Sequence, residues 1–530
     1  MDEDKSYAVF HHENSDKASI SQANAAHLTN EEDKELGKWA TIKQNPYAFG
    51  WALFAVWTTL LVSFENNASG TVISIPQFRK DFGVLFEGNY VIPANWQSAF
   101  SGAPVASTAI GALTAGQIAD WMGRKNTIAA ALLGSFVSVT LEFIATTSPI
   151  FFLGKLINGF VVGTLAATST TYLGEVAPTA LRGLLTCMIA LAYTVGPLTA
   201  ALILNSTGTA ETRWAYRAVF CAQYGFSVVA TLIWPFMPES SWWLASKGKD
   251  EKALKSLRRL GHHREGEAEK RLAEIKLTLE EVKRETQNVS YLECFRVSNL
   301  RRTIISIAPL TIQALSGVIF IAGYFTYYAQ LAGFSTAMSF QLYVALQAVS
   351  MFGNICSWEL VDRVGRRNLT LWGSISLTFV LMLAGGLATA GTPGAIKGCL
   401  AVMVFYGFVY NSTIGATSYT ILTENATSRL RVKTIAIGVA LQNVWYTMWN
   451  FVIPYLFNPD KANLGAKISF IFGGLSFLCC IYIFFYQTET AGRSYEELDE
   501  MYIKKVPARA FKTYVTDAQR DAQFARQNPQ

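Results

Sequence analysis

A single acid inside a long apolar segment is the residue whose type and position most directly suggest chemistry. Glu65 is the only charged residue between positions 47 and 67. An ionisable group at membrane depth is costly unless it faces a wet cavity or a partner, so we interpret Glu65 as functional. Burial favours its neutral form and a nearby cation favours its carboxylate, so it could bind and release a proton as its surroundings change.

A second set of charged residues lies in short turns, and it occurs in two copies at nearly constant offsets along the chain. The matched positions are Asp120 and Asp362, Arg124 and Arg366, Glu175 and Glu424, Arg182 and Arg431, and Glu239 and Glu489. Arginines in such turns can bind carboxylates on neighbouring helices, and we expect these pairs to break when an inner gate opens. Solvated loop charges would explain one such turn equally well, but matched turns in both halves favour a gate.

The chain offers little of the chemistry that enzymes and metal sites use. Its five histidines all lie in polar stretches, and its seven cysteines are scattered without metal-ligand spacing. The net charge of +6 comes from basic residues spread over short loops, with no aromatic-interleaved patch for nucleic acid. We therefore expect no enzyme activity, no metal, no cofactor and no nucleic-acid partner.

The elements that must position these charges are apolar segments. The chain has 530 residues, of which 51% are hydrophobic and 15% charged, whereas soluble domains carry about a quarter charged residues. A bilayer core about 30 Å thick needs roughly 20 apolar residues in a helix. Such segments occur at 47–67, 96–119, 127–146, 150–173, 184–204, 217–236, 302–328, 338–360, 369–390, 398–422, 435–456 and 467–487. The sequence predicts an all-α membrane protein with 12 transmembrane helices.

Lysine and arginine collect in the connections after the even-numbered segments, which places those connections and both termini in the cytoplasm. The predicted organisation is a disordered tail at 1–45, a six-helix half at 46–238, a helical linker at 239–301, a second six-helix half at 302–488 and a tail at 489–530. The linker could instead be a flexible tether. Two repeated halves around a central site are typical of transporters that work by alternating access.

The repeated motifs resemble those of the sugar porter family of the major facilitator superfamily, from about residue 47 to about residue 512. The resemblance rests on two Asp-x-x-Gly-Arg-[Arg/Lys] turns, on Glu-x-x-Pro-x-x-x-Arg-Gly at 175–183 and on Pro-Glu-Ser at 238–240. Within that family, the segments 75–78, 323–328, 489–493 and 506–509 are similar to fungal maltose permeases and general α-glucoside:proton symporters. The resemblance implies the major facilitator fold, and it assigns the ten matched turn residues to the inner gate.

The resemblance also implies a coupling pair. Glu65 occupies the position of an aspartate that accepts the coupling proton, and Lys155 occupies that of its basic partner on the fourth span. An alternative is that Glu65 lies near the external end of its span while Lys155 extends to the lipid headgroups.

A sugar needs amides, hydroxyls and aromatic faces in its cavity, because each hydroxyl must regain the hydrogen bonds it loses from water. By this resemblance, Gln313 and Gln442 match glutamines of the family. Tyr419 and Ser350 stand at positions where the family has a tryptophan and an asparagine. Further candidates, chosen because polar and aromatic groups tend to avoid lipid, are Asn354, Tyr327, Asn443, Trp445 and Asn450, although helix packing would explain each as well. Ala190, Ala314 and Ile319 replace other polar positions of the family.

The leading hypothesis is uptake of an α-glucoside or other disaccharide by proton symport, in the plasma membrane and as a monomer. The apolar replacements keep open an exporter of a fungal secondary metabolite, and a nutrient sensor without transport is a third alternative. Expected partners are the solute, the proton and the lipid bilayer. Asn205 begins an Asn-Ser-Thr motif in a predicted external loop and could be glycosylated.

Overall fold

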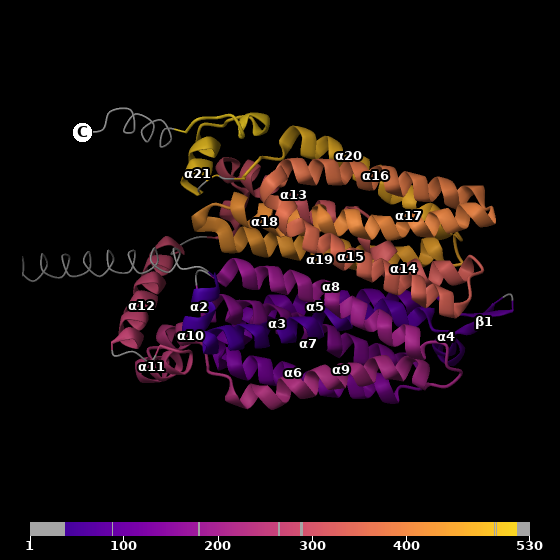
Figure 1. The fold of residues 1–530 in the computed structure, drawn as a ribbon, viewed down its shortest axis with the longest axis horizontal. Helices are drawn as coiled ribbons and strands as arrows, with labels where there is room; N and C mark the ends of the chain where they lie inside the picture. Colours follow the sequence, from indigo (N-terminus) through magenta and orange to yellow (C-terminus); the bar gives the residue numbers. More distant parts are fainter. Residues whose placement is uncertain are drawn as a thin grey trace, which may run out of the picture.

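The computed structural model describes residues 38–86, 88–178, 181–262, 266–286, 290–491, 493 and 495–516. Two bundles of long helices lie side by side, one built from the first half of the chain and one from the second (Figure 1). Most of the predicted tail at 1–45 lies outside the described residues, which begin with the short helix α2 (Lys38–Gln44).

The first bundle, here the N-half, contains six long helices in the predicted places. They are α3 (Pro46–Thr71), α5 (Ala94–Met122), α6 (Arg124–Ile144), α7 (Ser148–Val176), α8 (Arg182–Thr207) and α9 (Trp214–Ile233). Between α3 and α5 lie the short helix α4 (Pro76–Phe82) and an antiparallel hairpin of β1 (Val84–Phe86) and β2 (Asn89–Val91), in which Val84 pairs with Val91. The sequence did not predict this hairpin.

The second bundle, the C-half, repeats this plan with two interruptions. Its helices are α13 (Val297–Leu315), α14 (Val318–Leu331), α15 (Thr336–Val364), α16 (Arg366–Ala390), α17 (Pro393–Ser412), α18 (Ile414–Asn425), α19 (Arg431–Phe457) and α20 (Ser469–Tyr486). The predicted spans at 302–328 and 398–422 each fall within one membrane-crossing stretch. A break divides each stretch into two helices, because Gly317 has φ +89° and Thr413 leaves helical geometry at φ −125°. Broken helices tend to line binding cavities in membrane transporters.

The two ends of the molecule differ. At one end, here the linker end, lie α10 (Ser241–Ser246), α11 (Asp250–Arg259), α12 (Glu267–Thr286) and the C-terminal α21 (Tyr495–Ile503) (Figure 1). The β1–β2 hairpin marks the opposite end, the hairpin end. The described part of the linker contains α10, α11 and α12.

Among the described residues, ten helical stretches are long and apolar enough to cross a membrane. Outward-facing Leu133, Phe379 and Phe485 are exposed, as lipid-facing side chains would be. The other two long helices, α5 and α19, are less apolar and pack against each other across the two halves. They are therefore shielded from lipid on one side by the opposite half.

Packing inside each half is tight and largely independent of the other half. One large hydrophobic cluster belongs almost entirely to the C-half, and a second belongs entirely to the N-half and linker. In the N-half, α5 and α7 approach so closely that a Cβ at Gly159 would lie 2.3 Å from the Pro104 carbonyl oxygen, and one at Gly163 would lie 2.1 Å from that of Thr108. Small residues permit such backbone contact between membrane helices.

Candidate functional site

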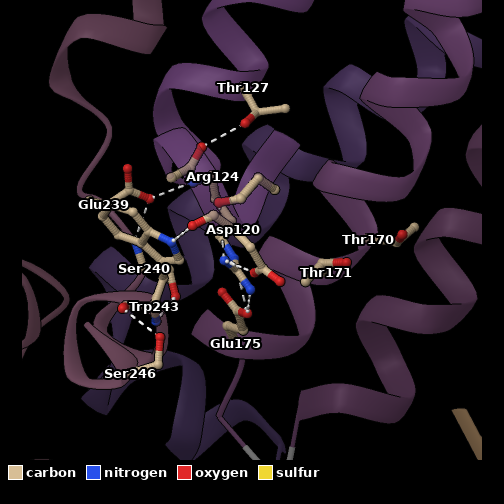
Figure 2. A network of polar contacts seen from close by, with 12 residues as sticks. Asp120, Arg124, Thr127, Thr170, Thr171, Glu175, Glu239, Ser240, Trp243 and Ser246 are labelled. Carbon is tan, nitrogen blue, oxygen red and sulfur yellow. Dashed lines mark hydrogen bonds and ion pairs between the residues drawn. The ribbon is translucent and has the colours of Figure 1, made fainter. Parts of the chain in front are cut away.

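The linker end of the N-half carries the first copy of the charged motif (Figure 2). The Arg124 guanidinium lies 3.0 Å from Asp120 Oδ1 and 3.0 Å from Glu175 Oε1, so it connects α5, α6 and α7. Glu239 Oε1 accepts hydrogen bonds from the backbone N–H groups of Arg124 at 2.8 Å and Lys125 at 3.1 Å. A carboxylate at this position satisfies the free N–H groups at the start of α6 and interacts favourably with its dipole.

The C-half repeats this geometry. Arg366 lies 3.2 Å from Glu424 Oε1, and Glu489 accepts hydrogen bonds from the backbone N–H groups of Arg366 at 2.9 Å and Arg367 at 3.2 Å. Arg431 begins α19. The side chains of Arg182 and Asp362 lie outside the described part of the chain.

Each of these described ion pairs joins helices of one half. A rocking motion that keeps each half rigid would leave Arg124–Glu175 and Arg366–Glu424 intact, so their expected breaking on gate opening stays a prediction. The contacts of Arg124 and Glu239, and of Arg366 and Glu489, instead hold the first turn of α6 and of α16 in place. Each set of contacts is here called a brace.

Hydrogen bonds do join the two halves at the hairpin end. Tyr343 on α15 donates to Asn67 Oδ1 on α3 at 2.6 Å, and Arg79 on α4 donates to Gln330 Oε1 on α14 at 2.8 Å. The Arg79 guanidinium also lies 5.1 Å from the centre of the Tyr327 ring. Burial lowers the pKa of Arg79, and the nearby Tyr327 opposes that shift. The halves are therefore held together at this end.

Glu65 and Lys155 are in direct contact inside the N-half. Lys155 Nζ donates to Glu65 Oε1 at 2.6 Å, and the two side chains are 1% and 4% exposed. The alternative in which Lys155 extends to the lipid headgroups is wrong, because its side chain is enclosed by α3, α6 and α7.

A third charged residue, which the sequence interpretation missed, completes this cluster. Glu142 on α6 lies 2.9 Å from Lys155 Nζ and is fully buried. It is the only charged residue in the predicted segment 127–146, so the criterion that selected Glu65 would have found it. The three residues are here called the buried triad.

Three of the predicted cavity residues meet in the C-half. Gln442 on α19 donates through Nε2 to Gln313 Oε1 on α13, and Tyr419 on α18 donates to Gln442 Oε1 at 3.2 Å. Tyr446, one turn along α19, lies 3.3 Å from Gln442 Nε2 and was not predicted. This cluster presents amide and hydroxyl groups of the kind that bind a polyhydroxyl solute.

The other predicted cavity residues are more dispersed. Asn443 and Asn450 donate to carbonyl oxygens of their own helix at 2.9 and 2.8 Å. Ser350 and Asn354 are buried on α15, Trp445 is half-buried on α19, and Tyr327 belongs to the contact at the hairpin end. Asn205 is exposed but lies in the last turns of α8, and its predicted place in a loop is wrong.

Comparison with known proteins decides the family. The family model described as "Sugar (and other) transporter" matches residues 51–502. The chain belongs to this transporter family. It is therefore an integral membrane transporter and not an enzyme, and the resemblance stated from its motifs is confirmed.

Relatives in yeast agree with this assignment. The transporter is 30% identical over 482 residues to the alpha-glucosides permease MPH3 of Saccharomyces cerevisiae, covering 89% of this chain and 80% of the permease. It is 26% identical over 517 residues to the general alpha-glucoside permease of the same species, covering 94% and 82%.

Solved structures confirm the predicted fold class. A partially occluded inward-open structure of the xylose transporter XylE from E. coli superposes with a TM-score of 0.69 at 19% identity, covering 85% of this transporter and 100% of that chain. A structure described as the proton:xylose symporter XylE bound to 6-bromo-6-deoxy-D-glucose gives a TM-score of 0.66 at 21% identity, covering 86% and 99%. The transporter has the major facilitator fold.

The contacts at the linker end predict that replacing either of two glycines lowers the stability of the transporter. Gly123 and Gly365 have φ of +92° and +89° with extended ψ, a region that costs other residues about 1–3 kcal/mol. A Cβ would also lie 2.3 Å from Glu239 Oε2 or 2.6 Å from Glu489 Oε2. We expect Gly123→Ala and Gly365→Ala each to lower the melting temperature of the purified transporter by several degrees.

Gly116→Ala on α5 is the matched control, since a Cβ there meets nothing within 4 Å. Its melting temperature should equal or slightly exceed that of the unmodified transporter, because alanine favours a helix interior. Equal melting temperatures for all three variants would contradict the proposed brace.

Proposed function

We propose that this transporter takes up an α-glucoside or another disaccharide by proton symport with alternating access. The observation that carries the proposal is the buried contact of 2.6 Å between the Lys155 ammonium and the Glu65 carboxylate. An acid held in this way at membrane depth is a group whose protonation can be tied to the movement of the helices around it. The α-glucoside permeases among the relatives supply the substrate class.

The separation of the two halves supports alternating access. Each half has its own hydrophobic core, so the halves can move against each other without repacking their interiors. The bonds from Arg79 and Tyr343 close the hairpin end, and breaking them opens the space between the halves at that end. The cluster of Gln313, Gln442 and Tyr419 binds the solute between the two ends.

The charge distribution supports an orientation in the membrane. The linker helices lie at the linker end. The basic turns with Arg124 and Arg366 bind Glu239 and Glu489, which precede α10 and α21 at that end. Positively charged loops are retained on the cytoplasmic side, so the linker end and both termini face the cytoplasm and the hairpin end faces outward. In the proposed function the transporter acts as a monomer in the plasma membrane.

Apolar substitutions favour a second candidate, export of a less polar metabolite. Ala314 directly follows Gln313 and is buried on the same helix, and Ile319 lies just beyond the break at Gly317. A cavity with fewer amides than a sugar site would accept a solute with fewer hydroxyls.

Uptake measurements separate the two functions. The transporter would be expressed in a yeast that lacks its own hexose and maltose carriers, with its presence at the cell surface verified. Uptake of labelled maltose, sucrose, cellobiose and glucose would then be measured at pH 5 with and without a protonophore. We expect saturable, protonophore-sensitive uptake of a disaccharide. Absence of uptake by surface-localised transporter would contradict the proposal and favour export.

Gln442→Ala tests the solute cluster. We expect it to raise the KM for the transported sugar about tenfold, since a lost hydrogen bond of ~1.4 kcal/mol corresponds to that factor. Asn411→Ala on α17 is the control, because Asn411 is not a cavity candidate and its amide donates to the Gly407 carbonyl oxygen of its own helix. Equal KM values for the two variants would remove Gln442 from the solute site.

Glu65→Gln tests coupling. Glutamine keeps the shape of the side chain but cannot exchange a proton, so we expect sugar to equilibrate across the membrane without accumulating. Exchange of labelled for unlabelled sugar should continue. Glu269→Gln, which changes a half-exposed acid of the linker paired with Arg258, should accumulate sugar normally. Full accumulation by Glu65→Gln would exclude Glu65 as the coupling acid.

A further inference from the structure

The buried triad contains one base between two acids. Lys155 Nζ lies 2.6 Å from Glu65 Oε1 and 2.9 Å from Glu142 Oε2, and none of the three side chains is more than 4% exposed. The rings of Phe151 and Phe220 lie 5.7 and 5.3 Å from the same ammonium, so the surroundings are apolar. The three charges come from α3, α6 and α7.

The charges of this triad do not balance when all three groups are ionised. Two carboxylates and one ammonium give a net charge of −1, and an uncompensated charge in apolar surroundings costs several kcal/mol. A proton shared with one carboxyl group restores neutrality.

Glu142 has a further partner inside the N-half. Glu142 Oε1 accepts a hydrogen bond from Asn158 Nδ2 at 2.9 Å, and Asn158 Oδ1 in turn accepts one from Gln223 Nε2 at 3.4 Å. A donor of this kind stabilises the carboxylate form. A Cβ added at Gly154 would lie 2.8 Å from Glu142 Cγ, so the neighbouring helix also confines the side chain. The Glu142 side chain is thus fixed in place inside the N-half.

Glu65 is closer to the boundary between the halves. The next residue, Asn66, is exposed, and Asn67 accepts the hydrogen bond from Tyr343 of the C-half. Separation of the halves at the hairpin end therefore uncovers Asn67, which lies two residues along α3 from Glu65. Glu142 lies on α6, which packs against α7 and α9 within the N-half.

Other titratable groups lie on the elements around the triad. They include Arg79, Lys80 and Asp81 on α4, Cys187 and Tyr193 on α8, Tyr216, Arg217, Cys221 and Tyr224 on α9, Asp120 on α5, Arg124 and Lys125 on α6, Tyr172 and Glu175 on α7, and Tyr324, Tyr327 and Tyr328 on α14. Tyr216 donates to Asp81 at 2.9 Å, and Arg217 lies over the Phe143 ring. Among the described residues, the ion pairs of Lys155 are those with Glu65 and Glu142.

We propose that Glu142 is the resident counter-ion of Lys155 and that the transported proton binds and leaves at Glu65. The inference rests on the proton coupling of the proposed function. When Glu65 takes a proton from water at the hairpin end, Lys155 keeps Glu142 as its partner and no isolated ammonium is left in the apolar interior. When the proton leaves to water at the linker end, the Glu65 carboxylate binds Lys155 again. Glu142 is a positioning residue for this exchange.

Glu142→Gln tests the proposal through pH dependence. In the unmodified triad, proton binding changes the net charge from −1 to 0, whereas in the variant it changes the charge from 0 to +1. The variant should bind the proton less readily, so the pH of half-maximal uptake should move at least one unit toward acid. A purely structural residue would change the amount of transporter at the surface without moving this pH. An unchanged pH profile would overturn the proposal.

A second measurement does not need an identified sugar. Infrared titration of the purified transporter in lipid vesicles records the C=O band of protonated carboxyl groups. We expect a band in the unmodified transporter that titrates at lower pH in Glu142→Gln and is lost in Glu65→Gln. Loss of the band in Glu142→Gln with retention in Glu65→Gln would overturn the assignment of the two roles. This titration stands even if none of the tested sugars is transported.

A double variant tests the proposal if the single variant Glu142→Gln does not fold. If Glu142→Gln destabilises the fold, Glu142→Gln with Lys155→Met removes both partners together and leaves Glu65 without a charged neighbour in the triad. Its carboxyl band should then titrate at higher pH than that of the single variant, because no ammonium stabilises the carboxylate. Identical titrations of the single and double variants would contradict the proposal. Glu269→Gln is the control and should match the unmodified transporter.

Discussion

A buried ammonium group is tolerated in this transporter only because carboxylates surround it. Lys155 is enclosed by three helices, and its two acidic partners come from two of them. Removal of either partner's charge changes the electrostatic balance of the whole cluster, since all three side chains are buried. A change in how α3, α6 and α7 pack would therefore also change the protonation of the cluster.

At the linker end, carboxylates also compensate donor groups, but these side chains are more exposed than those of the triad. Glu239 and Glu489 each satisfy backbone N–H groups at the start of a helix, and Arg124 and Arg366 bind acids of neighbouring helices. Because these contacts stay within one half, they make each half stiffer without joining the two. Stiff halves connected by weaker contacts are what a rocking mechanism requires.

Much of this architecture was predictable because lipid imposes a simple rule on composition. The twelve apolar segments fall on the observed long helices, and the repeated turns at Asp120 and Asp362 revealed the duplication. The breaks at Gly317 and Thr413 were not predictable, since apolar composition continues through both. Glu142 was predictable from the sequence by the criterion that selects Glu65, but the family resemblance assigns a role only to Glu65 and Lys155. The contact between Gln313 and Gln442 depends on how separate helices pack, which no local pattern encodes.

The close approach of α5 to α7 has a consequence for how the chain is made. α5 is one of the two long helices that are not apolar enough to qualify as membrane-spanning on their own, and its partner across the halves, α19, is synthesised only after most of the chain. Until then, α7 is the main helix that packs against α5, with close backbone approach at Gly159 and Gly163. We therefore expect stable membrane insertion of α5 during synthesis to depend on α7, so that the two helices are inserted together.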